Sequence, residues 1–220
     1  MTIAALTTYR SEEHPNMLWL EVETEDGVTG LGETFYAAEA VEAYVHANLA
    51  PIVLGLSAID IEAVHHRTRP YIGFVAASTE LRALSALDIA LWDALGKVTG
   101  QPVSVLLGGR VRDQIPVYNT CAGTRYVRGP KLGTTENFGI RSGGKADDFE
   151  DLHGFLNDPV GLAGSLLDMG IDSMKIWPFD YAAEANQGHV ISPADLAKGL
   201  APFEAIRKAY GERTQLSAEL

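Results

Sequence analysis

The chain has 220 residues, of which 46% are hydrophobic and 21% charged, so it can build one large or two small globular cores and is unlike a disordered chain. Its formal net charge of −12 disfavours nucleic acids and anionic membranes as partners, because an acidic surface repels both. Cys121 is the single cysteine, which excludes an internal disulfide. The N-terminal residues do not resemble a signal peptide, and no apolar run approaches the roughly 20 residues that span a bilayer, so we expect a cytoplasmic protein.

The first 35 residues predict antiparallel strands. Residues 17–24 alternate polar and apolar side chains in their second half, Glu25-Asp26-Gly27 supplies a turn, and residues 28–33 return as a Gly-rich strand. A polar loop over residues 10–16 joins this hairpin to an earlier strand.

Three helices are predicted next, over residues 37–49, 60–69 and 79–98. Pro51 stands just past the first and Pro70 after the second, and Gly100 follows the third. Leucines at three- and four-residue spacing run through the third helix, at positions 84, 87, 91 and 95. Strands followed by helices indicate an α+β domain, which we predict over residues 1–110.

Beyond residue 110 strands and helices alternate. Strands are predicted over residues 114–121, 172–177 and 214–219, with helices over 160–169 and from Ser192 onward. Asp158-Pro159 and Ser192-Pro193 are typical helix starts. This alternation predicts a parallel sheet with right-handed crossovers in a second domain, residues 111–220. The long, charged, Gly-rich connection over 122–157 is typical of a lid or a disordered segment.

Several motifs together resemble the mandelate racemase and muconate lactonizing branch of the enolase superfamily, and its acid-sugar dehydratases in particular. They are Gly30-Leu31-Gly32-Glu33, the run from Ser85 to Lys97, Gln101-Pro102-Val103 and Leu106-Leu107-Gly108-Gly109. The resemblance implies an α+β capping domain followed by a (β/α)8 TIM-type barrel. Because a full barrel takes about 250 residues, only its first strands would be present, and we expect a longer protein that forms a homo-oligomer.

The resemblance also implies Mg²⁺ and abstraction of the proton α to the carboxylate of a small anionic substrate, a sugar acid or hydroxy acid. Glu219 stands where the family places its first metal ligand, although an isolated Glu at this position would be read as a surface residue. Lys175 matches the first Lys of the family's KxK motif and is the candidate catalytic residue, the alternative being a lysine paired with an acid. Trp177 replaces the second Lys, the usual base, which favours dehydration over racemisation. Its ring is either a stacking wall for a sugar or part of the core.

Weaker signals single out further substrate-binding candidates. Asn119 lies at the end of the first barrel strand, and His14 and Tyr36 lie in the two capping loops that close over substrate in this family. Solvated loop residues remain the alternative for His14 and Tyr36, and Cys121 is interpreted as a core residue. Three hypotheses stay open: a Mg²⁺-dependent acid-sugar dehydratase (a carbon–oxygen lyase), a racemase or epimerase of a hydroxy acid, and a non-catalytic binding or scaffold protein that kept the fold.

Overall fold

The computed structural model describes residues 1–69, 71, 78–123 and 150–219. The chain divides into two compact units, Met1–Asp113 and Gln114–Leu220, whereas the sequence places the boundary between residues 110 and 111. Each unit has a hydrophobic core of its own.

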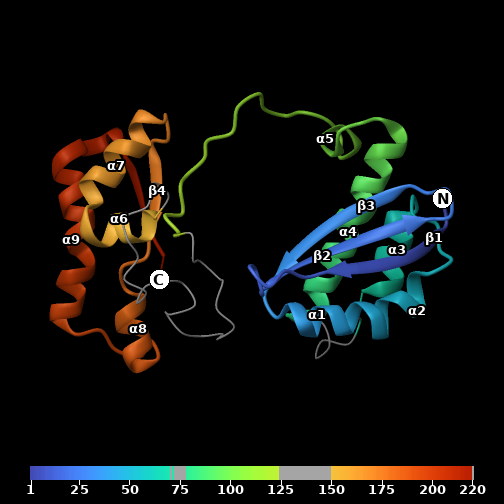
Figure 1. Ribbon diagram of the computed structural model, residues 1–220. Coiled ribbons are helices and arrows are strands. Elements are labelled where there is room, and N and C mark those ends of the chain that lie inside the picture. Colours follow the sequence, from blue (N-terminus) through green and yellow to red (C-terminus); the bar gives the residue numbers. More distant parts are fainter. Residues whose placement is uncertain (70, 72–77, 124–149, 220) are drawn as a thin grey trace. The chain divides into compact units, whose positions relative to one another are not determined.

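The first unit is built on a three-stranded antiparallel sheet in the order β1-β2-β3 (Figure 1). Its strands are β1 (Ile3–Tyr9), β2 (Met17–Thr24) and β3 (Thr29–Phe35). Leu18, Leu20 and Val22 are fully buried because alternate side chains of β2 point to the same face. The predicted hairpin is confirmed, and its turn contains Gly27 with a φ of +76°.

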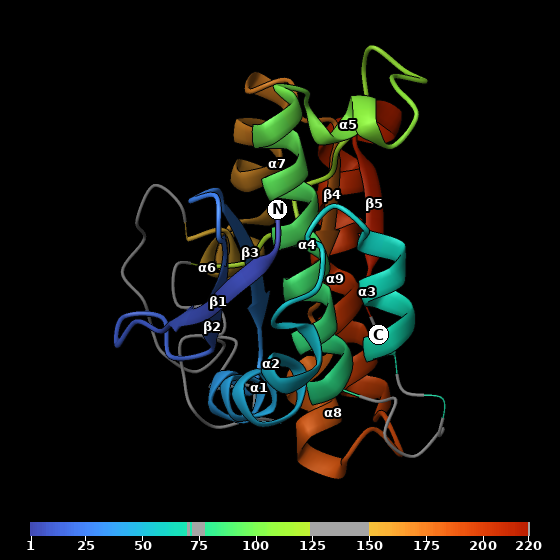
Figure 2. The ribbon, with the colours of Figure 1, turned by 90° about the vertical axis from the view of Figure 1, so that its right-hand side faces the viewer.

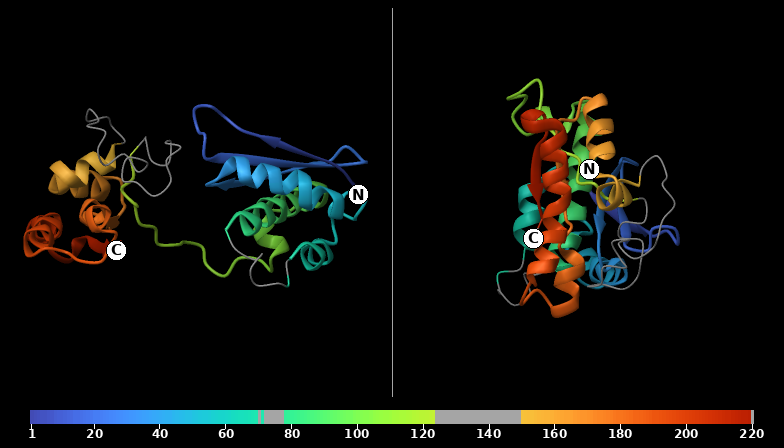
Figure 3. Two further views of the ribbon diagram at one scale, coloured as in Figure 1. Left: turned by 90° about the horizontal axis from the view of Figure 1, so that it is seen from below. Right: turned by 90° about the vertical axis from the view of Figure 1, so that its left-hand side faces the viewer.

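Helices cover one face of this sheet, as the left view of Figure 3 shows. They are α1 (Ala38–Tyr44), a π-helical turn (Val45–Leu49), α2 (Ala50–Val53), α3 (Ile61–Thr68), α4 (Thr79–Thr99) and α5 (Val103–Leu106). The three predicted helices are confirmed. Pro51 lies within α2, which follows the π-helical turn without a break, so the helical segment continues past the proline to Val53 instead of ending before it.

The long helix α4 runs along β3 (Figure 2). A Cβ atom at Gly30 would overlap the carbonyl oxygen of Ala90, and one at Gly32 would overlap that of Ala86. The two glycines of the Gly30-Leu31-Gly32-Glu33 motif are therefore required for the helix to approach the sheet this closely.

The second unit contains two parallel strands, β4 (Ser173–Ile176) and β5 (Gln215–Ala218), in a register that pairs Lys175 with Ser217. The helices α8 (Asp180–Asn186) and α9 (Pro193–Tyr210) connect these strands, and α6 (Asp151–Asn157) and α7 (Pro159–Asp168) precede them. Met174, Ile176 and Ile206 are buried together with apolar residues of α6 and α7. A parallel β-α-β unit is thus confirmed.

The predicted helix starts are also confirmed. The Asp158 carboxylate accepts a hydrogen bond from the Gly161 N–H at 3.0 Å, and the Ser192 hydroxyl accepts one from the Asp195 N–H at 3.1 Å. Each side chain satisfies a backbone donor that the first turn of a helix leaves without a partner.

Two predictions for the start of this unit are wrong. Residues 114–121 are not a buried strand: Asn119 alone forms a parallel bridge, to Met174, and Ile115 and Val117 are 74% and 62% exposed. Apolar alternation buries a strand only where a layer covers it, and the described residues provide no such layer here. The connection predicted over 122–157 ends earlier, because α6 begins at Asp151.

The α+β character of the first unit agrees with the prediction for a capping domain. Within the described part of the second unit, the parallel pair and the bridge to Asn119 are present but no closed barrel is, so the barrel stays a proposal. No helix in these ranges has both the length and the apolar character needed to cross a membrane.

Candidate functional site

Lys175 and Glu219 meet at the carboxyl ends of the two parallel strands. Met174 and Ile176 point into the core of the unit, so Lys175, which lies between them, is on the opposite face of β4. Glu219 follows β5, two residues beyond Ser217, the register partner of Lys175, and its N–H donates to the carbonyl of Ile176 at 3.1 Å. The Lys175 Nζ lies 2.5 Å from the Glu219 Oε2.

This ion pair is half-buried on its lysine side. The Lys175 side chain is 22% exposed and that of Glu219 is 55% exposed. The Lys175 Nζ also lies 5.6 Å from the centre of the Tyr118 ring, within range of a cation–π interaction. The charge of this lysine, in the middle of a strand, is balanced by the Glu219 carboxylate and lies near the face of an aromatic ring. Its ammonium lies at the carboxyl ends of the two strands.

The side chain of Asn119 is fixed by two hydrogen bonds. Its Nδ2 donates to the Asp151 Oδ2 at 2.9 Å, and its Oδ1 accepts from the Cys121 N–H at 2.6 Å. The Cys121 side chain is fully buried, and burial, followed by the negative charge of Asp151, raises the pKa of its thiol to about 12. A thiol that stays protonated at neutral pH is a poor nucleophile, so Cys121 is a core residue.

The Trp177 side chain is 5% exposed and belongs to the core of the second unit. Its Nε1 donates to the Thr120 carbonyl at 3.0 Å, and its ring centre lies 5.7 Å from that of Phe155. The ring therefore packs between the segment carrying Asn119 and α6. Contact with a substrate is untested and remains a prediction.

Two acidic residues near this edge were not singled out in the sequence. Asp151 holds Asn119, and Asp180 is half-buried at the start of α8; burial, followed by the charge of Glu219, raises the pKa of the Asp180 carboxyl. Asp180 could have been found as the first carboxylate after the strand that carries Lys175. Asp151 was not recognised because it belongs to a run of acidic residues in the connection that was predicted to be a lid or a disordered segment.

His14 and Tyr36 belong to the first unit. His14 is half-buried in the loop between β1 and β2, and its carbonyl accepts from the Met17 N–H at 2.9 Å. The Tyr36 N–H donates to the Asn16 carbonyl at 2.8 Å, which ties the residues after β3 to this same loop. The basic residues of the long connection, Arg125, Arg128, Lys131, Arg141 and Lys145, lie outside the described residues.

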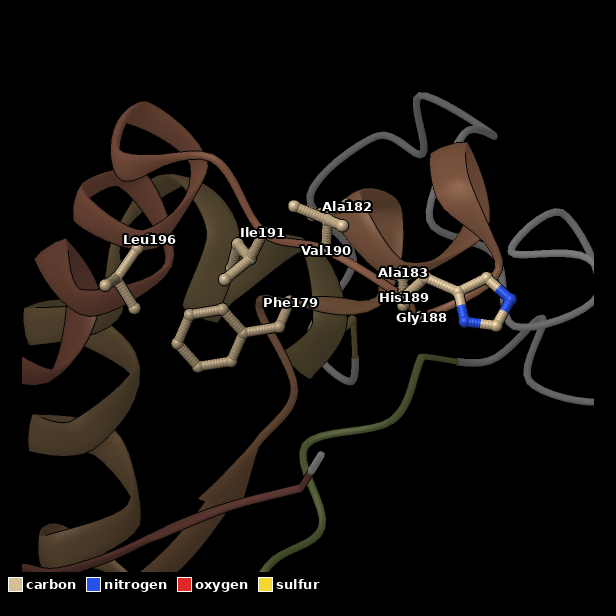
Figure 4. Close-up of a pocket in the computed structure, with 8 residues that line it drawn as sticks. All are labelled: Phe179, Ala182, Ala183, Gly188, His189, Val190, Ile191 and Leu196. Carbon is tan, nitrogen blue, oxygen red and sulfur yellow. The ribbon is translucent and has the colours of Figure 1, made fainter.

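A separate hollow of about 410 Å³ lies between α8 and the start of α9. Figure 4 shows the ring of Phe179 beside Ile191 and Leu196, while the imidazole of His189 points away from them. Its lining is mainly apolar and includes neither Lys175 nor Glu219. This hollow is therefore unsuited to hold a small anion and is distinct from the strand-end site.

The sequence and fold place the chain in a known family. Residues 3–108 match the N-terminal domain of mandelate racemase and muconate lactonizing enzyme. This part of the chain belongs to the enolase superfamily, as a capping domain of its mandelate racemase and muconate lactonizing branch. The motifs that carried the resemblance lie within the matched residues, apart from Gly109, which directly follows them. The structure explains two of these motifs: the glycines of β3 admit α4, and Asp93 of α4 accepts the Leu31 N–H at 2.8 Å.

The relatives that the chain matches are longer than the chain. D-Galactonate dehydratase of Xanthomonas campestris is 41% identical over 128 residues, which are 57% of this chain and 32% of that protein. An enolase of the mandelate racemase subgroup from Agrobacterium tumefaciens (41% identity) and an enolase from a Sargasso Sea environmental genome (44%) each match the whole chain with a TM-score of 0.80. The chain spans half of each of these two structures.

The superfamily uses Mg²⁺, and the described residues of this chain provide only part of a binding site for that ion. The described residues contain no group of three or more His, Cys, Asp or Glu side chains that could hold an ion. Mg²⁺ requires several oxygen ligands in near-octahedral geometry, and the carboxylate of Glu219 is engaged by Lys175. These residues alone therefore do not fit the ion.

Proposed function

We propose that the protein is an acid-sugar dehydratase, a carbon–oxygen lyase that removes the proton α to a carboxylate and then expels the β-hydroxyl. The observation that carries the proposal is the Lys175–Glu219 pair at the carboxyl ends of neighbouring parallel strands. Barrel enzymes place their chemistry at these ends. The identity of 41% to D-galactonate dehydratase over 128 residues supports the choice of reaction.

The reaction needs positive charge beside the substrate carboxylate. A general base takes up the α proton, and the electron pair left on the α carbon spreads into the carboxylate as an enediolate. Return of this pair forms a carbon–carbon double bond and expels the β-hydroxyl, which takes up a proton and leaves as water. The enol product then takes a proton at its β carbon and becomes a 2-keto-3-deoxy acid. Fixed cations that face the developing charge lower the barrier because they need no reorganisation.

Lys175 supplies one such cation in the proposed site. Its ammonium is held at the strand ends by Glu219 and the Tyr118 ring, so it can donate to a substrate carboxylate without searching many rotamers. Glu219 would supply one oxygen ligand to Mg²⁺, with the remaining ligands outside the described residues.

Trp177 argues against the racemase or epimerase alternative. Inversion at the α carbon needs a group that takes or gives a proton on each face of the substrate, and an indole can do neither at neutral pH. The Trp177 Nε1 is bound to the Thr120 carbonyl, and the ring is in the core. The position of the second Lys in the KxK motif is therefore filled by a residue that cannot act as a base.

Four residues are proposed to contact the substrate: Asn119, Trp177, His14 and Tyr36. The amide of Asn119 is held by Asp151, so a substrate hydroxyl would replace or extend an existing hydrogen bond. A homo-oligomer and a cytoplasmic location also remain predictions, and light scattering of the native gene product tests the first of them.

The test uses the protein produced from its native gene, after its intact mass has been compared with 23.7 kDa. We would incubate it with Mg²⁺ and a panel of sugar acids that includes D-galactonate, in D₂O, and follow the reaction by proton NMR. We expect a 2-keto-3-deoxy acid carrying deuterium at its third carbon. Lys175→Met should reduce kcat/KM by about 100-fold or more, because it removes a charge-assisted contact made in the transition state.

Lys208→Met is the matched control, since it removes an exposed lysine of α9 and should leave the rate unchanged. Glu219→Gln should weaken Mg²⁺ binding measured by calorimetry. If no substrate exchanges its α proton or eliminates water, and the intact protein binds no Mg²⁺, the enzyme hypothesis is wrong and the non-catalytic binding protein is favoured.

A further inference from the structure

The turn after β3 has an unusual backbone. Tyr36 and Ala37 have φ values of +77° and +52°, and neither is glycine. The left-handed conformation costs an L-residue about 1–2 kcal/mol because its Cβ crowds the following carbonyl oxygen. Two such residues in succession persist only where their surroundings hold them, and strain of this kind is concentrated at functional sites.

Arg82 of α4 holds this turn from one side. One of its terminal nitrogens, Nη1, donates to the carbonyl of Phe35 at 2.7 Å. The guanidinium carbon lies 5.1 Å from the centre of the Phe35 ring and 5.4 Å from that of the Tyr36 ring. The two rings meet edge to face with their centres 5.3 Å apart. A planar cation that both stacks and donates restrains the backbone and the Tyr36 ring together.

The backbone holds the turn from the other side. The Tyr36 N–H donates to the carbonyl of Asn16, a residue that is 7% exposed. Asn16 is in the loop that contains His14, so both proposed substrate contacts of the first unit depend on one connected arrangement. Arg82 contributes a positive charge to this arrangement from α4, the long helix that packs on the sheet.

We infer that Arg82 is a positioning residue, which fixes the ring of Tyr36 and thereby sets the affinity for substrate without touching it. The inference rests on the proposed function, because it takes Tyr36 as a contact to the sugar acid. A residue of this kind affects binding of substrate and transition state equally, so its loss should raise KM and leave kcat nearly unchanged.

A double-mutant cycle on the protein from its native gene tests this inference. The substrate is the sugar acid that the wild type converts fastest. Arg82→Ala should raise its KM roughly 5–10-fold, which corresponds to the loss of about one hydrogen bond, while kcat stays within about twofold. Arg82→Lys keeps the charge and one donor but not the stacking plane, so it should restore part of the affinity. In a Tyr36→Ala background, Arg82→Ala should raise KM no further, because its effect acts through that ring.

Arg67→Ala is the matched control, because it removes an exposed arginine of α3 in the same unit and should leave KM unchanged. Additive effects of Arg82→Ala and Tyr36→Ala on KM would overturn the inference and show that Arg82 acts on substrate independently. An unchanged KM in an active Arg82→Ala enzyme overturns the inference about Arg82 but leaves the proposed function standing. A wild-type protein without activity overturns the proposed function, and the inference about Arg82 with it. Should Arg82→Ala fail to fold, the same cycle with Arg82→Lys decides.

Discussion

The two units of the chain cover their sheets differently. In Met1–Asp113 one face of an antiparallel sheet is packed against helices, and the other carries polar contacts, such as the Trp19 Nε1 that donates to Glu33 at 3.0 Å. In Gln114–Leu220 the described helices cover one face of a parallel pair, and the other face presents Lys175 and Ser217. Antiparallel sheets commonly face water on one side, but parallel sheets are normally covered on both.

This difference separates structural residues from candidates for chemistry. In the first unit most unusual residues have a packing reason: Gly30 and Gly32 admit α4, and Asp93 and Lys97 bind the outer backbone of β3. In the second unit, Lys175 lies beside Glu219 on the face of β4 that the described helices do not cover, so packing against those helices does not account for this lysine. The residues that packing leaves unexplained are therefore those to which we assign chemistry.

The comparison predicts the largest loss of stability for a substitution in the core of the first unit. Leu20 is fully buried in β2, so Leu20→Ala should lower the free energy of unfolding by roughly 2–5 kcal/mol, through lost burial and the cavity left behind. Urea unfolding followed by circular dichroism measures the change. Leu31→Ala on the neighbouring strand is the control, because its side chain is 46% exposed and its loss should cost far less. Equal effects would show that this sheet is not buried on one face.

Replacing Gly32 by alanine should have the next largest effect. The added Cβ would meet the backbone carbonyl of Ala86, so α4 must move away from β3, at a cost of roughly 1–3 kcal/mol. Gly27→Ala adds the same atom in a turn where nothing lies within 4 Å, and there only the φ of +76° opposes it, at about 1 kcal/mol. Hydrogen exchange should show faster opening of β3 and α4 in Gly32→Ala and no change in peptides of the second unit. Faster exchange in β4 or β5 would contradict the independence of the two cores.

Smaller effects are expected at the helix starts of the second unit. Asp158→Ala and Ser192→Ala each remove a side-chain acceptor from the first turn of α7 or α9, and each should cost about 1 kcal/mol. Asp158→Asn and Ser192→Thr retain an acceptor and should recover most of this loss. A full loss in those conservative variants would show that charge or size, and not capping, stabilises these helices.

The elements of the fold that could be predicted from the sequence are those that depend on local residues, such as the capped helices. The helix starts at Ser192 and Asp158, the leucine-lined α4 and the hairpin around Gly27 were all predicted, because each depends on residues close together in the chain. The predicted buried strand over 114–121 was wrong since burial depends on which layers cover a segment, and no local pattern contains that information. Helix α6 was missed because Gly154 and flanking charges weaken its helical pattern.

The candidate site could be predicted in part for the same reason. Lys175 and Glu219 were found as residues at strand ends, from local patterns and a family motif. Their pairing at 2.5 Å depends on the parallel register of β4 and β5, which are about forty residues apart in the chain. The roles of Asp151 and Arg82 could not be predicted, because each acts on a residue that only the folded chain brings near it.

The smallest predicted effect concerns the charge of Asp88 on α4. Burial raises the pKa of its carboxyl above the usual 3.8, while nearby His65 lowers it and Glu62 raises it. The folded state then binds the Asp88 proton more tightly than the unfolded state, so this residue adds stability as the pH falls through the raised pKa and loses it as the pH rises. Asp88→Asn should therefore stabilise the protein at pH 7, by roughly half a kcal/mol or less because the group is partly exposed.

The pH dependence distinguishes this effect from a change in packing. The stability difference between Asp88→Asn and wild type, from urea unfolding at several pH values, should be largest at neutral pH and shrink as the pH approaches 3.8. Asp60→Asn, at an exposed carboxyl before α3, is the control for removing one negative charge from an acidic protein. If both variants gain the same stability at pH 7, relief of the net charge of −12 explains the gain, and burial of Asp88 does not.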